Sequence, residues 1–232
     1  MATHLTKKKK EALKLCEKSK FYSIEEAIDI LKKMPKRKFD ETLELAMNLG
    51  LNPKDASQIV RGTTLLPHGT GKSVRIAVFC KGDDEKKAKE AGADFIGSDE
   101  LIKKVSGGFC DFDVAIASTV MMRDIARLGK VLGPRGLMPN PKVGTVTDDI
   151  TKAVKETKAG KVEFKMDKQA GLHVSVGKIS FEKGNLIENI KHLVKAILGS
   201  NPHLNKPQVI KSIVVSTTMG PGIKLDISEF RG

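Results

Sequence analysis

The sequence predicts a discontinuous two-layer α+β domain of residues 1–68 and 160–232, into which a three-layer Rossmann-like α/β domain of residues 69–159 is inserted. Two observations predict this arrangement. Short apolar strands alternate with helices only in the middle of the chain, which is typical of βαβ units and a parallel sheet covered on both faces. One amphipathic strand near the N-terminus finds partner strands only after residue 160. Because a lone half-apolar strand is not stable, we expect the two ends of the chain to share one sheet.

The middle segment carries the alternation of strands and helices. We expect three short apolar strands, at Val74–Phe79, Phe95–Ile96 and Asp113–Ala117. We expect helices at Asp84–Ala91, from Ser98 to Val105, at Met121–Leu128, and from Thr147 to Lys158. Ser98 and Thr147 are placed as N-caps, since a hydroxyl accepts hydrogen bonds from the free N–H groups of the first helical turn.

The two ends of the chain show a different pattern. Ser23 followed by Glu26 predicts a capping box for a helix that runs to about Lys33. Leu43–Leu49 alternates apolar and polar residues, as a strand with one solvated face does. Further strands are predicted at Val162–Met166, Leu172–Val176, Ile213–Thr218 and Lys224–Ile227, and an amphipathic helix at Leu186–Leu198. Both crossovers between the domains contain glycine, so we expect a two-strand hinge there.

The charge of the chain points to a polyanionic partner. Its 232 residues include 41 Lys and Arg against 28 Asp and Glu, so the formal net charge is +13. Such an excess is typical of proteins that bind nucleic acid, although solvated surface lysines give the same count. Nine Phe, one Tyr and no Trp are present, which argues against a protein that stacks many bases on aromatic side chains.

Several classes of protein are disfavoured. The longest uncharged stretch, Ser212–Ile223, has twelve residues, whereas a membrane-spanning helix needs about 20. No apolar segment follows the basic run Lys7–Lys10, so we expect no secretory signal. Three cysteines at unrelated spacings predict neither a disulfide framework nor a zinc site, and they suit a reducing compartment.

The sequence shows no constellation for catalysis, so we expect no catalytic residue, cofactor or metal. His68–Ser73 looks like the end of a phosphate-binding loop, but its first glycine is missing and a strand follows where a helix should. A turn between domains is the favoured interpretation. The turn Cys80–Asp83 has one glycine and lacks the dinucleotide fingerprint. An enzyme that uses the α/β domain is nevertheless one alternative, and stabilisation by nucleotides would favour it.

Gly129–Gly144 combines glycines and prolines with Lys130, Arg135 and Lys142. It is either a basic contact loop or an ordered cover over the end of the parallel sheet, and the residues favour neither.

Two segments at the ends of the chain are candidate contacts with RNA. Lys36–Thr42 places cations beside Phe39, which can contact phosphates and pack on a ribose or base. Ser216–Gly222 ends a strand in hydroxyls, Met219 and small residues, which let an RNA backbone approach and can bond its 2′-hydroxyls. The alternatives are a core-anchoring Phe beside a solvated turn, and an ordinary end of a strand.

On these residues the chain resembles the bacterial large-subunit ribosomal protein L-one family, the protein of the mobile stalk beside the tRNA exit site. The similarity covers nearly the whole chain. Its markers are Lys38–Thr42, Val60–Thr63, Leu66–Lys72, Ala91–Asp94, Gly129–Pro141, Gly144–Val146 and Thr217–Pro221.

The resemblance implies that the discontinuous domain binds a folded region of large-subunit rRNA. The residues implied as contacts lie in three segments and are Lys38, Phe39, Glu41 and Thr42, then Lys165, Lys168, Gly171 and His173, then Ser216, Thr218, Met219 and Gly220.

The resemblance also implies a setting and two further partners. We expect a monomer within the cytoplasmic ribosome, with no membrane partner, whose inserted domain moves with the stalk as deacylated tRNA leaves. Members of the family also commonly bind a similar fold in their own operon mRNA and repress its translation. A nonspecific DNA-binding protein is the second alternative, and it would show little preference between a folded rRNA fragment and duplex DNA.

Overall fold

The computed structural model describes residues 7–17, 20–35, 37–55, 57–202 and 209–230. The chain forms two compact units, one of Met1–Gly71 with Val162–Gly232 and one of Lys72–Lys161. We call them the α+β unit and the α/β unit. The sequence pattern places these divisions two or three residues earlier, after residues 68 and 159.

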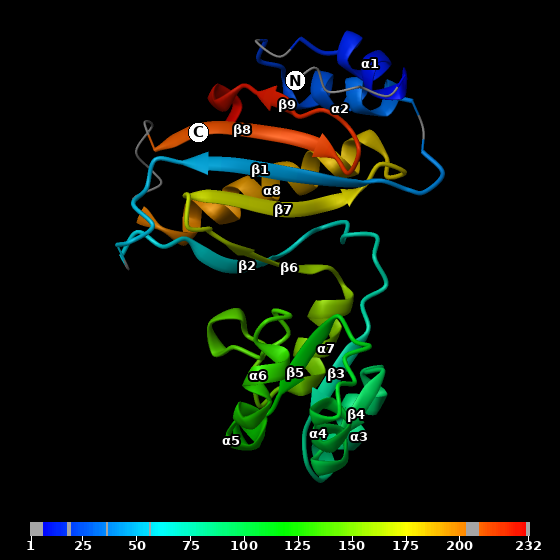
Figure 1. The fold of residues 1–232 in the computed structure, drawn as a ribbon, viewed down its shortest axis with the longest axis vertical. Coiled ribbons are helices and arrows are strands. Elements are labelled where there is room, and N and C mark those ends of the chain that lie inside the picture. The colour runs from blue at the N-terminus through cyan, green and yellow to red at the C-terminus, as the bar shows by residue number, and fades with distance from the viewer. Residues whose placement is uncertain (1–6, 18–19, 36, 56, 203–208, 231–232) are drawn as a thin grey trace. The chain divides into compact units, whose positions relative to one another are not determined.

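A four-stranded antiparallel sheet forms the centre of the α+β unit, and its strands come from both ends of the chain (Figure 1). Their order is β7 (Gly171–Lys178), β1 (Thr42–Leu49), β8 (Ile210–Thr217) and β9 (Ile223–Leu225). β1 pairs with β7 on one side and with β8 on the other. The predicted pairing of the N-terminal strand with strands after residue 160 is therefore confirmed.

One face of this sheet carries the core. The apolar residues of β1 between Leu43 and Leu49 are buried, and those that alternate with them are exposed or half-buried. α2 (Ile24–Lys33) and α8 (Lys183–Ser200) pack against the buried side, and Figure 1 shows α8 behind β1 and β7. The alternation thus gives the sheet one covered and one solvated face, as a half-buried antiparallel sheet requires.

A two-stranded pair of β2 (Arg61–Leu65) and β6 (Lys161–Lys165) differs from the prediction. The sequence pattern predicts no strand between residues 50 and 70, and it treats 162–166 as a partner of the N-terminal strand. The centre of β2 is Gly62 followed by two threonines, so the apolar alternation that identifies a strand is absent. Gly62 is required by packing, because a Cβ there would lie 2.7 Å from the ring Cζ of Phe164.

Three parallel strands form the sheet of the α/β unit. β3 (Ile76–Phe79) lies between β4 (Phe95–Gly97) and β5 (Val114–Ala117). One face packs on α4 (Asp99–Ser106) and on the helical turns that follow β5, and the other face packs on α3 (Asp83–Glu90) and α7 (Ile150–Lys158). The predicted parallel sheet, covered on both faces, is confirmed.

The helix predicted at Met121–Leu128 is instead a run of short turns that continues beyond it. The run comprises η1 (Thr119–Met121), α5 (Met122–Ile125), η2 (Ala126–Leu128) and α6 (Gly129–Leu132). It extends into the predicted loop because Leu132 is buried in the same core as Leu128. The remaining elements are α1 (Lys7–Lys14), η3 (Pro141–Val143) and η5 (Ile227–Phe230).

Two of the three predicted N-caps need correction. The capping box of Ser23 and Glu26 is confirmed, with both of its hydrogen bonds present. Ser98 precedes α4, but its side chain makes no cap bond. Asp149, rather than Thr147, caps α7 by accepting from the N–H of Lys152, while the Thr147 hydroxyl accepts from the N–H of Asp149. A carboxylate one residue before the helix has the shorter reach to its free N–H groups.

Asn189 of α8 is fully buried and joins three backbone groups. Its Nδ2 donates to the carbonyl oxygens of Val176 and Gly69, at 2.9 and 3.1 Å, and its Oδ1 accepts from the N–H of His68 at 3.1 Å. Asn189→Leu should lower the free energy of unfolding by about 2–3 kcal/mol, because the buried carbonyl of Val176 and the partly buried groups of Gly69 and His68 lose their partner. Urea unfolding followed by circular dichroism measures the change. Lys195→Ala, on the exposed side of α8, is the control, and equal midpoints for the two variants would contradict the assignment.

Candidate RNA-binding surface

The solvated side of the four-stranded sheet presents rows of small and polar residues in register. Glu44 of β1 lies between Ser175 and Ser216, and the next outward residue, Ala46, lies between His173 and Val214. We call this surface the open face. It comprises Thr42, Glu44, Ala46, Asn48, Gly171, His173, Ser175, Ser212, Val214 and Ser216. Apart from Glu44 and His173, these side chains are small or medium-sized, so an RNA backbone could approach the sheet closely between them.

The residues implied as contacts gather at the two ends of the open face. Since β1 and β8 are antiparallel, the segment before β1 and the turn after β8 meet at one end, which we call the Met219 end. The turn between β6 and β7 lies at the other end, beside Asn48, and we call it the Asp167 turn. Thr42 and Asn48 are six residues apart along β1, so about 20 Å of strand separates the two ends.

The buried side chain of Glu41 joins the segment before β1 to the turn after β8. Its side chain is only 7% exposed, and Oε1 accepts from the N–H of Met219 at 2.9 Å and from the hydroxyl of Thr217 at 3.4 Å. Oε1 is therefore directed into the protein. Glu41, which the resemblance implies as a contact, therefore also positions Met219.

The neighbouring residues fix the segment before β1. The Asp40 carboxylate accepts from the Ser180 hydroxyl at 2.6 Å, and Lys178 Nζ donates to the Asp40 carbonyl and to the Thr42 hydroxyl, at 3.2 and 3.1 Å. The side chain of Phe39 nevertheless remains 54% exposed, and that of Met219 is 53% exposed. Two large apolar side chains thus stand in water on a backbone that is held in place. Phe39 does not anchor the core, so that alternative is excluded.

Thr218 and Gly220 complete this end. The Thr218 hydroxyl accepts a hydrogen bond from the N–H of Thr42 at 3.1 Å, so it joins the turn after β8 to the start of β1. A Cβ at Gly220 would lie 2.4 Å from the Thr217 hydroxyl, so only glycine fits there. Lys38 and Ser216 lie beside these residues, and Lys38 is exposed.

The Asp167 turn is closed by one carboxylate. Asp167 Oδ1 accepts from the N–H groups of Gln169 and Gly171, both at 2.7 Å. These two bonds, with a smaller contribution from the nearby charge of His173, hold the pKa of Asp167 below its ordinary value. A Cβ at Gly171 would lie 2.9 Å from Asp167 Oδ2, so the turn requires glycine. Ala170 adopts a left-handed conformation with φ 61°.

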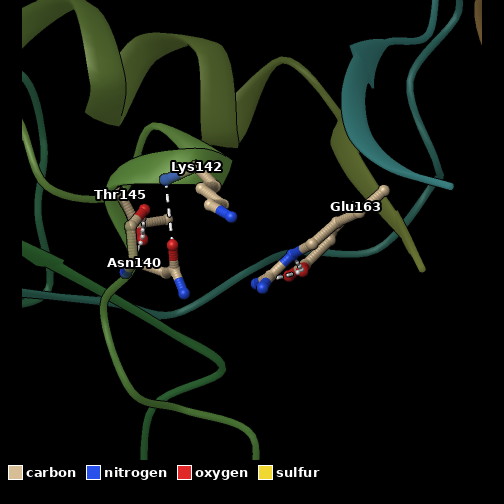
Figure 2. A network of polar contacts seen from close by, with 5 residues as sticks. Asn140, Lys142, Thr145 and Glu163 are labelled. Atoms are coloured by element: carbon tan, nitrogen blue, oxygen red, sulfur yellow. Dashed lines mark hydrogen bonds and ion pairs between the residues drawn. The ribbon is translucent and has the colours of Figure 1, made fainter. Parts of the chain in front are cut away.

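Cations surround both ends without being neutralised. Lys38, Lys165 and Lys168 are exposed, and none of them forms an ion pair within the described ranges. By contrast, Arg61 pairs with Glu163 at 2.9 Å on β2 and β6, a contact drawn at Glu163 in Figure 2. Free ammonium groups beside a polar face can neutralise phosphates.

A shallow hollow of about 240 Å³ lies on the open face next to the Asp167 turn. It is lined by Ala46, Met47, Asn48, Asp167, Gln169, Gly171, His173, Ser212 and Val214. Nothing in it suits a metal, since no group of three His, Cys, Asp or Glu in the part of the chain that the structure describes could hold an ion. Among the same residues, no helix is long and apolar enough to cross a membrane.

The sequence does not identify six residues of the open face as site residues: Glu44, Ala46, Asn48, Ser175, Ser212 and Val214. The polar positions of β1 are visible in its alternation, but their neighbours on β7 and β8 depend on the register. That register includes irregularities between Leu43 and Glu44 and between Asn48 and Leu49, which no local pattern signals.

Comparison with known proteins adds two findings. The model of the ribosomal protein L1p/L10e family matches residues 31–221. The large ribosomal subunit protein uL1 of Protochlamydia amoebophila (strain UWE25) is 52% identical over 224 residues, which cover 97% of this chain and 95% of that protein.

Replacing Glu41 tests its role at the Met219 end. Glu41→Ala should lower the free energy of unfolding by about 1–3 kcal/mol, because the partly buried N–H of Met219 and the buried hydroxyl of Thr217 lose their acceptor. Hydrogen exchange at that amide should accelerate. Glu44→Ala is the control, because it removes an exposed carboxylate from the same strand. It should change the free energy of unfolding by less than about 0.5 kcal/mol. Equal effects of the two substitutions would refute the positioning role.

The Asp167 turn should depend on pH in a defined direction. Because its pKa is lowered in the folded chain, the stabilisation is complete above the ordinary value of 3.8 and is lost as the pH falls through the lower, folded value. An NMR titration of the Gln169 and Gly171 amides should show this transition, and Asp167→Asn should remove it. A midpoint at or above 3.8 would contradict the geometry.

Proposed function

The chain belongs to the ribosomal protein L1p/L10e family, and from that premise we propose that its open face binds a folded region of large-subunit rRNA. The protein is a component of the large ribosomal subunit, and its place is the cytoplasmic ribosome. The observation that carries the proposal is the open face itself, a sheet surface of mainly small and polar side chains between two fixed turns. We propose a binding protein, not an enzyme.

The chemistry of the two ends suits a folded RNA. Exposed lysines neutralise phosphates, which supplies affinity but little specificity. Phe39 and Met219 offer apolar surface to a ribose or base, and the hydroxyls of Ser175 and Ser216 lie where they can bond 2′-hydroxyls. Duplex DNA lacks the 2′-hydroxyls that these serine hydroxyls can bond. The arrangement therefore favours RNA over duplex DNA.

Two further partners belong to the same proposal. We propose that the protein helps release deacylated tRNA near the exit site, as the resemblance to the mobile-stalk protein implies. We also propose that it represses translation of its own operon. A messenger segment with the fold of the rRNA site would occupy the same open face, so messenger and rRNA would compete for one protein.

Selectivity between RNA and DNA tests the proposed function. A fragment of the large-subunit rRNA stalk should bind far more tightly than a duplex DNA of equal charge. The preference for RNA should persist as the salt concentration rises. Hydrogen bonds to 2′-hydroxyls and the fit to a folded RNA do not depend on counterion release. If both ligands bind alike and both are lost together as salt rises, only the net charge acts and the proposal fails.

The exposed apolar pair should contribute to this binding without supporting the fold. Phe39→Ala and Met219→Ala should each weaken rRNA binding by about tenfold. Stacking of a base on an aromatic ring is worth about 1–3 kcal/mol, and burial of a Met side chain is worth about 1.5–3 kcal/mol. Their unfolding midpoints should stay near the wild-type value. Val120→Ala, which shortens an 80% exposed apolar side chain of the α/β unit, should leave affinity unchanged. Equal losses in all three variants would contradict the assignment.

A further inference from the structure

The parallel sheet of the α/β unit has one covered edge and one open edge. Beside β5 the chain returns along the sheet, where the N–H of Ala117 donates to the Thr145 carbonyl at 2.9 Å and its carbonyl accepts from Thr147 at 3.1 Å. At the opposite edge, β4 pairs with β3 alone among the strands that the structure describes. An edge strand of this kind keeps backbone groups available for another strand.

A hollow of about 510 Å³ lies along this open edge. It touches three consecutive residues, Asp94, Phe95 and Ile96, whereas neighbouring side chains of an extended segment point to opposite faces of a sheet. A hollow that reaches all three therefore lies beside the strand and not on one face of the sheet. Since β3 occupies the inner side of β4, the hollow lies on the outer side.

The walls of the hollow are apolar and well packed. Phe95 and Ile96 come from β4, and Leu101 of α4 and Phe109 complete the walls. The rings of Phe95 and Phe109 meet edge to face, with their centroids 5.2 Å apart. α4 packs so closely on β4 that a Cβ at Gly97 would lie 3.3 Å from the Cβ of Leu101. Walls held in this way are ordered before a ligand binds, which lowers the entropy cost of binding.

Two carboxylates and one ammonium group stand around the hollow, on Asp94, Glu100 and Lys104. Glu100 is exposed and forms no ion pair within residues 57–202. Asp94 Oδ2 accepts from the N–H of Ile76 at 2.9 Å, which leaves Oδ1 for a ligand. A cationic side chain beside either carboxylate would form a charge-assisted hydrogen bond.

The segment around the hollow is acidic in a basic protein. Residues 83–113, which include α3, β4 and α4, contain nine acidic and five basic residues, a net charge of −4, whereas the whole chain carries +13. A negative surface repels the phosphates of RNA and attracts cationic peptides. The charge of this edge therefore favours a basic protein segment as its partner.

We propose that the open edge of β4 binds an extended, basic segment of another protein, which adds a strand to the parallel sheet. The backbone of that segment pairs with β4, and one apolar side chain enters the hollow. Side chains two positions away on either side point in the same direction, so a lysine or arginine there reaches Asp94 or Glu100. This interaction lies outside the open face of the α+β unit and does not depend on the proposed binding of rRNA.

The probe is a heptapeptide, blocked at both ends, in which lysine, valine, phenylalanine, valine and lysine stand in that order between two threonines. Two matched peptides replace the phenylalanine with alanine or both lysines with glutamate. Two more carry N-methyl groups, one on the valine amides and the other on the phenylalanine and lysine amides. Binding of each peptide to the full chain is measured by fluorescence anisotropy, and amide NMR signals of the protein locate the contact.

The parent peptide should perturb the amide signals of residues 94–97 and of α4, and it should slow hydrogen exchange in β4. The alanine and glutamate peptides should each bind at least about tenfold more weakly, because they lose the side chain in the hollow or reverse the charge. Perturbation centred on other elements, or no binding at a peptide concentration of about 1 mM, would overturn the inference.

The N-methylated pair tests the addition of a strand. Backbone N–H groups of a strand point alternately to its two sides, so only one of the two sets faces β4. One N-methylated peptide should therefore bind at least about tenfold more weakly than the other. Equal affinities of the two peptides would show that the segment does not pair as a strand, and the proposal would fail.

Three variants of the full chain test the hollow itself. Phe109→Ala should weaken binding of the parent peptide by about tenfold, because it removes an aromatic wall. Glu100→Lys should weaken binding by about fivefold, as expected when an exposed ion pair is lost. Asp148→Lys is the control, since it reverses an exposed charge of the same unit outside the hollow, and it should change affinity by less than about twofold.

Thermal unfolding establishes whether each variant folds. Phe109 is half-buried, so Glu100→Lys, at an exposed position, decides the outcome if Phe109→Ala does not fold. Equal losses in Glu100→Lys and Asp148→Lys would mean that only net charge acts, and would overturn the inference. Sedimentation of the chain without peptide should show a monomer. A dimer that the peptide dissociates would place a second copy of this chain on the edge, and the assignment to another protein would be wrong.

Discussion

The position of β1 between β7 and β8 is the constraint on which the rest of this structure depends. An N-terminal strand with one apolar side can be buried only when the last third of the chain returns to pair with both of its edges. The parallel sheet of the α/β unit is therefore necessarily an insertion between two parts of another unit. The same pairing brings the segment before β1 to the turn after β8, and so assembles the Met219 end from residues almost 180 positions apart.

The open face combines fixed backbone with free side chains. Hydrogen bonds within the protein engage the side chains of Glu41, Asp40 and Lys178. These bonds fix the backbone at the Met219 end, and Phe39 and Met219 remain exposed on it. At the opposite end, the Asp167 carboxylate fixes the backbone of its turn by accepting two hydrogen bonds. Such preorganisation reduces the ordering that RNA binding would otherwise require, which favours tight binding to one folded shape.

The sequence predicts the elements well where the hydrophobic period is clear, as in β1 and α8, and where a capping box adds to it, as in α2. It fails at β2, where Gly62 and two threonines hide a strand that exists because of its contact with Phe164. It also does not show that Glu41 bonds the turn after β8, because these two segments meet only in the folded sheet. The members of the open face on β7 and β8 depend on register, which is a property of the assembled sheet and not of any local pattern.

The most direct test of the account is to map the rRNA contact on the protein residue by residue. Amide NMR signals of the full chain would be followed as the stalk fragment is added. The account predicts perturbation along the outward residues of β1, β7 and β8 and at both end turns, Thr218–Gly220 and Asp167–Gly171, with the strands of the α/β unit unchanged. Perturbation centred on the carboxyl ends of the parallel strands, with a silent open face, would contradict it.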